Sequence, residues 1–90
     1  MIKCFHAGVR WGIALSPVAL KTRADLATAL NDAFAGEIIS CGRGDILNIV
    51  FLDVDGRVTE FPSLRNGARD RSNKWKGCVD RAAKIYVRRG

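Results

Sequence analysis

Apolar and small or charged residues alternate near the start of the chain. From Val9 to Leu15 every second residue is apolar, and a period of two is typical of a strand with one buried face. Ile2–His6 is expected to pair with it as a second strand, with Ala7-Gly8 as a tight turn between them. Pro17 has no N–H to donate to a sheet, so it should end the second strand.

A helical period follows. Apolar residues recur at every fourth position, at Leu26, Leu30 and Phe34. Thr22 and Asp25 have the spacing of a capping box, in which the side chain of each residue accepts a hydrogen bond from the backbone N–H of the other. Gly36 is the residue type expected at a left-handed C-cap. The pattern predicts a helix over 23–35.

The middle of the chain has the pattern of a β-hairpin. Ile46–Leu52 is apolar on both faces, which is typical of a central strand. Asp55-Gly56 is a strong turn signal, and Val58–Phe61 is the expected returning strand, ended by Pro62.

Helical spacing returns near the end of the chain. Trp75 and Val79 fall on one helix face after an N-cap at Ser72 or Asn73, although Gly77 weakens such a helix. Ile85–Val87 is a last short strand.

These elements run strand, strand, helix, strand, strand, helix, strand. That order predicts an α+β fold: a ubiquitin-like β-grasp roll with a mixed sheet of about five strands and two helices on one face. Ninety residues make a single domain over 1–90.

Positive charge is concentrated in the last third of the chain. Residues 65–90 hold nine of the 15 basic side chains and only two of the nine acidic ones. Such asymmetry favours an anionic partner, either nucleic acid or an acidic protein surface.

Candidate chemistry is sparse. His6 is the single histidine, and Cys4 lies two positions away, so a strand would place both on one face. Two ligands do not make a zinc site, and nothing marks an activated thiolate. We therefore expect that the protein is not an enzyme and that it has no catalytic, cofactor-binding or metal-binding residues. The three cysteines form no Cys-x-x-Cys pair, which favours an intracellular compartment; no apolar run is long enough for a membrane span.

Read end to end, the chain resembles the carboxy-terminal dimerisation domain of plant auxin response factors and Aux/IAA repressors, a Phox/Bem-type interaction domain of β-grasp fold. The resemblance begins at Ile2-Lys3-Cys4 and includes a helix at residues 25–34. It continues through the acidic turn of residues 49–56 and ends with Trp75 to Val87. The motifs agree with the family in order and spacing over nearly the whole chain.

The resemblance implies a protein–protein interaction module that associates front to back, with a basic face meeting the acidic face of a related domain. Lys3 is then the basic-face anchor, with Arg10 as a neighbour, and Asp53 and Asp55 are what remains of the acidic face. Arg57 stands where the family has a third acid, so the acidic face is expected to be impaired. Auxin-type transcriptional regulation and a nuclear location follow from the same resemblance.

Two other classes of function remain open. A small nucleic-acid-binding domain would use residues 65–89, and its phosphate contacts would come from the basic side chains of the first half of that segment: Arg65, Arg69, Arg71, Lys74 and Lys76. A ubiquitin-like modifier is suggested by the Arg88-Arg89-Gly90 end, but conjugation usually needs a flexible Gly-Gly tail.

Overall fold

The computed structural model describes residues 1–35, 41–65 and 68–90. Its strands are β1 (Ile2–His6), β2 (Gly12–Leu15), β3 (Leu47–Asp53), β4 (Val58–Phe61) and β5 (Ala82–Arg89). Its helices are α1 (Arg23–Ala33), α2 (Ser72–Arg81) and the 3₁₀ turn η1 (Pro17–Ala19). Gly36, the expected C-cap of α1, lies outside the described residues.

The strands form one mixed sheet in the order β2-β1-β5-β3-β4. β1 and β5 are parallel, and the other neighbouring pairs are antiparallel. β3 lies inside the sheet, as its apolar character predicted. The predicted α+β fold with five strands and two helices is confirmed, and the β-grasp roll remains our prediction for the finer fold type.

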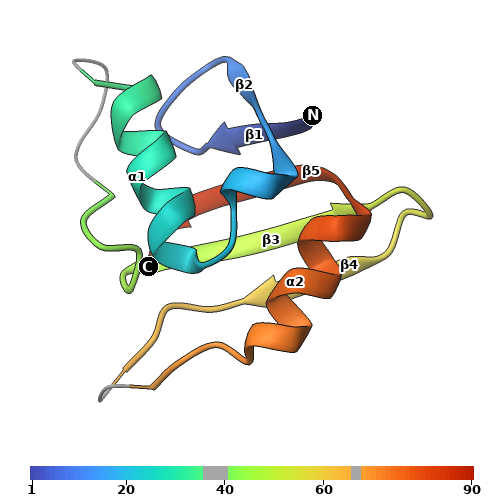
Figure 1. Cartoon of the computed structure of the whole chain (residues 1–90). Coiled ribbons are helices and arrows are strands. Elements are labelled where there is room, and N and C mark those ends of the chain that lie inside the picture. The colour runs from blue at the N-terminus through green and yellow to red at the C-terminus, as the bar shows by residue number, and fades with distance from the viewer. Residues whose placement is uncertain (36–40, 66–67) are drawn as a thin grey trace.

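Both α-helices lie against the same face of the sheet (Figure 1). Alternate residues of each strand point into the core between the layers, among them Cys4 of β1, Ile49 of β3 and Ile85 of β5. Trp75 of α2 packs edge-to-face against Phe51 and Phe61, with ring centroids 5.1 and 5.3 Å away. The core position predicted for Trp75 is therefore confirmed.

The start of α1 also follows the sequence. The Thr22 hydroxyl accepts a hydrogen bond from the Asp25 N–H, and the Asp25 carboxylate accepts one from the Thr22 N–H, both over 3.1 Å. This capping box satisfies two N–H groups that have no partner inside the helix.

Two strand predictions were wrong. β2 begins at Gly12 instead of Val9, because residues 7–11 form a longer connection in which the Val9 N–H bonds the His6 carbonyl. The last strand covers eight residues, Ala82–Arg89, where Ile85–Val87 was predicted. It starts directly after α2, and it is long because β1 and β3 pair with it on both sides.

Arg23, a buried arginine at the start of α1, forms hydrogen bonds with the loops beside that helix. The Arg23 guanidinium donates to both carboxylate oxygens of Asp70, over 2.7 and 2.9 Å. It also donates to the carbonyls of Leu47, at 2.6 Å, and of Pro62, at 2.9 Å. Arg23 is only 5% exposed. A buried charge needs partners inside the fold, and these hydrogen bonds supply them.

No helix in the described parts of the chain is long and apolar enough to cross a membrane.

Candidate functional site

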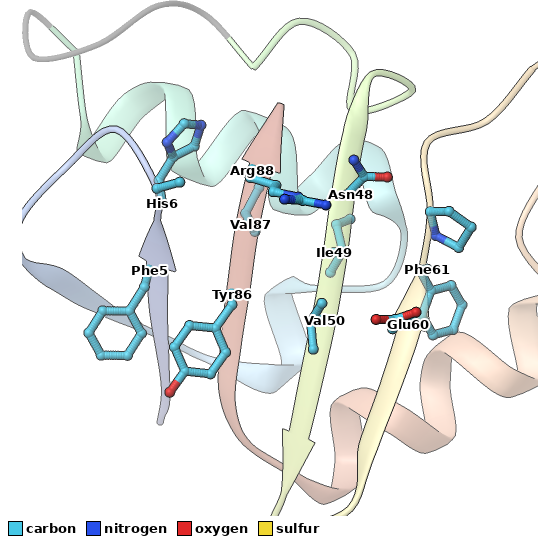
Figure 2. A pocket seen from close by; sticks show the side chains of 12 residues that line it. Phe5, His6, Asn48, Ile49, Val50, Glu60, Phe61, Tyr86, Val87 and Arg88 are labelled. Atoms are coloured by element: carbon cyan, nitrogen blue, oxygen red, sulfur yellow. The ribbon is translucent and has the colours of Figure 1, made fainter. Parts of the chain in front are cut away.

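The face of the sheet away from the helices is uncovered, and we call it the open face. Strand alternation decides which side chains reach it: in β1, Ile2 and Cys4 are buried while Lys3 is exposed and Phe5 is half-buried. Figure 2 looks onto this face, with the helices behind the strands.

Three cations from β5, the central strand, and its neighbour β1 lie on the open face. Lys3 of β1 stands directly opposite Lys84 of β5 in the register, and neighbouring strands are only about 4.8 Å apart. Arg88 follows Lys84 four positions later and is therefore on the same face of β5. All three side chains are exposed, and none forms an ion pair with any residue that the structure describes. Like charges placed side by side destabilise a sheet, so this region favours an anionic partner.

Aromatic rings accompany these cations. Phe5 and Tyr86 are opposite each other on β1 and β5, and their rings stack with centroids 5.3 Å apart and planes within 15°. Gly12 on β2 makes room for the Phe5 ring, because a Cβ at Gly12 would lie 2.6 Å from a ring carbon. A shallow depression of about 540 Å³ adjoins the pair, bordered by Asn48, Val50, Glu60 and Arg88 (Figure 2).

Arg10 does not join Lys3. Lys3 pairs in register with Ala14, near the far end of the β1–β2 hairpin, whereas Arg10 lies in the connection that follows His6. At about 3.3 Å per residue, three residues of β1 alone separate the two positions by roughly 10 Å. Lys84, which lies opposite Lys3 instead, was not among the predicted site residues.

The acidic pair faces its own chain. The Asp53 Oδ1 atom accepts hydrogen bonds from the N–H groups of Asp55 and Arg57, at 2.8 and 2.9 Å. Chiefly because of the bond from Arg57, the pKa of Asp53 is lowered from its usual value. Arg81 of α2 contacts both acids: its Nη2 is 2.6 Å from Asp55 Oδ2, and its Nε is 3.6 Å from Asp53 Oδ2.

Four of the five predicted nucleic-acid contacts border one open depression of about 430 Å³ beside β4: Arg65, Arg69, Arg71 and Lys74. Arg65, Arg69 and Arg71 are exposed in the connection between β4 and α2. Lys74 lies over the Phe61 ring, with its Nζ 5.4 Å from the centroid, and Lys76 lies two residues further along α2. The segment is anchored at its centre by the hydrogen bonds that the buried Arg23 donates to Asp70.

Cys4 and His6 give no reactive pair. Burial raises the pKa of the Cys4 thiol to about 12, so it is not a thiolate at neutral pH. His6 Nδ1 accepts a hydrogen bond from the Gly8 N–H at 2.9 Å, and desolvation lowers its pKa. Within residues 1–35, 41–65 and 68–90, no three histidine, cysteine or acidic side chains are grouped so that they could hold a metal ion.

Comparisons of the chain with models of protein families, with curated proteins and with solved structures found no match.

Proposed function

We propose that this protein is a protein-interaction module that binds the acidic surface of another protein through the open face of its sheet. The observation that carries the proposal is the side-by-side placement of Lys3 and Lys84 with no carboxylate partner among the described residues. An incoming carboxylate relieves the repulsion between the two ammonium groups and gains charge-assisted hydrogen bonds.

The module is one-sided. The Asp53 carboxylate is held by two backbone N–H groups of its turn and by Arg81, and the Asp55 carboxylate is held by Arg81, so they offer little to a basic partner. A chain with one competent face can end a front-to-back assembly but cannot extend it. The resemblance of the sequence suggests the partner: a Phox/Bem-type domain with an intact acidic face, belonging to a nuclear regulator of auxin-type transcription.

Calorimetric titration against such an acidic-faced domain tests the proposal. Ion pairs at an exposed surface are weak and sensitive to salt, so we expect micromolar affinity in low salt that falls as salt is added. Lys3→Ala should weaken binding roughly 5-fold. Lys76→Ala removes an equally exposed lysine from α2 and serves as the matched control, with affinity unchanged. Equal affinities for the wild type and Lys3→Ala would contradict the proposal.

Nucleic acid is less well supported as the partner. Trp75, the aromatic residue within the basic segment, is 1% exposed and donates its indole N–H to the Leu20 carbonyl at 3.0 Å. It therefore offers no face on which a base could stack, and stacking carries much of single-strand binding. A gel-shift assay at two salt concentrations checks this alternative, since phosphate contacts give a steep salt dependence.

A further inference from the structure

Apolar side chains continue the Phe5–Tyr86 pair across the open face. The register places Val50 of β3 beside Tyr86, and Leu52 of β3 beside Val58 of β4. Tyr86 on the central strand β5 is 41% exposed, and Val58 at the start of the edge strand β4 is 61% exposed. We call these five side chains the apolar shelf: Phe5, Val50, Leu52, Val58 and Tyr86.

Cations border the apolar shelf. Lys3 and Lys84 precede Phe5 and Tyr86 by two residues on their strands, and Arg88 follows Tyr86 by two, so all five side chains are on one face. Glu60, opposite Val50, is the acid on the described part of this face. An apolar centre with aromatic residues inside a charged rim is the usual anatomy of a protein interface.

We infer that the open face takes an acidic protein segment with an apolar side chain at its centre, which packs on the apolar shelf while flanking carboxylates meet the cations. This inference rests on the proposed function and names the chemistry of its partner. Tyrosine is enriched among the residues that dominate binding energy, whereas exposed ion pairs contribute little. The shelf is therefore the larger source of affinity, and the cations set orientation and salt dependence.

The arrangement of the rings favours protein over single-stranded nucleic acid. Phe5 stacks on Tyr86 with one face, so that face is closed to a base, and the Cδ1–Cε1 edge of its ring lies against Gly12. Val58 and Leu52 extend the apolar area well beyond the aromatic pair, which a chain of phosphates does not require. Glu60 would also repel phosphates at that edge.

Two synthetic peptides of twelve residues test the inference. Both contain only Glu and Asp except at two central positions, which are Leu in one peptide and Ser in the other. We expect the Leu peptide to bind the wild-type protein roughly 10-fold more tightly than the Ser peptide, as measured by fluorescence anisotropy. Equal binding of the two peptides, both weakened by salt, would overturn the apolar-shelf inference and leave the proposed function standing. Binding of neither peptide, together with no binding of the acidic-faced domain, would overturn both.

Variants of the shelf locate the effect. Tyr86→Thr retains a β-favouring residue, and Val50→Thr retains the side-chain shape; both should reduce the Leu/Ser ratio to about 2-fold or less while the salt dependence remains. Val18→Ala truncates an apolar side chain that is 78% exposed on η1 and should preserve the ratio. Circular dichroism confirms that each variant is folded. Ratios that stay near the wild-type value in both shelf variants would overturn the inference.

A gain of affinity gives an independent check. Glu60→Gln removes the acid beside the apolar shelf and should tighten both peptides about 2-fold in low salt. Asp32→Asn, at an exposed position of α1, is the matched control. Weaker binding by Glu60→Gln would overturn the inference, as would tighter binding of a twelve-nucleotide single-stranded RNA than of the Leu peptide.

Discussion

At the β3–β4 turn, Asp53 and Asp55 contact Arg81 of the same chain, whereas on the open face Lys3 and Lys84 are neighbours without an ion pair to any described residue. The first region uses its charges to hold a turn and a helix end in place. The second keeps exposed like charges together, which lowers the stability of the sheet. No contact with a described carboxylate offsets that loss. The contrast indicates that the acids stabilise contacts within the fold and that the cations are available to another molecule.

The largest expected effect comes from breaking a charge that the fold satisfies internally. Arg23→Leu would leave the Asp70 carboxylate, 15% exposed, and several backbone carbonyls without their donor. We expect a loss of about 3–5 kcal/mol in the free energy of unfolding, measured by urea denaturation. Arg43→Leu is the matched control, because Arg43 is 90% exposed and 3.5 Å from Asp45; it should change stability by less than about 0.5 kcal/mol. Similar losses in the two variants would contradict the account.

A second variant tests whether the contacts of Arg81 prevent Asp53 and Asp55 from binding a basic partner. Arg81→Ala removes the cation that contacts Asp53 and Asp55, and both carboxylates become available to Lys3 of another copy. Stability should fall by less than about 1 kcal/mol, while sedimentation velocity should show self-association near 100 µM that the wild type lacks. The double variant with Lys3→Ala should be monomeric again. A monomeric Arg81→Ala protein would contradict the claim that Arg81 is what prevents the acidic turn from binding Lys3 of another copy.

The smallest expected effect concerns pH. The pKa of Asp53 is lowered in the folded state, first by the hydrogen bond from the Arg57 N–H. Its carboxylate therefore stabilises the fold fully above the unfolded-state value of about 3.8, and that stabilisation is lost as the pH falls through the folded-state pKa. The difference in urea midpoint between the wild type and Asp53→Asn should be constant from pH 7 to pH 5 and should close in stronger acid. A difference that widens in acid would mean that the charge of Asp53 does not stabilise the turn.

Local signals in the sequence were sufficient for much of the fold. Ile2–His6 and Val58–Phe61 were predicted with the bounds that the structure shows, because a turn or Pro62 marks their ends. The length of β5 was underestimated, since no turn residue separates it from α2. In retrospect, the alternation of Lys84, Tyr86 and Arg88 with Ile85 and Val87 was its signal.

The candidate site was predictable only in part. Lys3 could be proposed from the sequence, but its pairing with Lys84 depends on the parallel contact between the first and last strands, which no local pattern encodes. Arg23 and Asp70 are 47 positions apart, so the burial of that arginine also had no sequence signal. Contacts between distant strands and loops are the information that only the structure supplies.

The most direct test of the central claim is a titration of the isotope-labelled protein with an acidic-faced Phox/Bem-type domain, followed by ¹H–¹⁵N correlation spectra. The account predicts that the largest shift changes fall on the open-face strands, at Lys3, Phe5, Lys84 and Tyr86, while the amides of residues 68–76 change little. Changes centred on the β4–α2 connection or on the β3–β4 turn, with the open face unaffected, would contradict it.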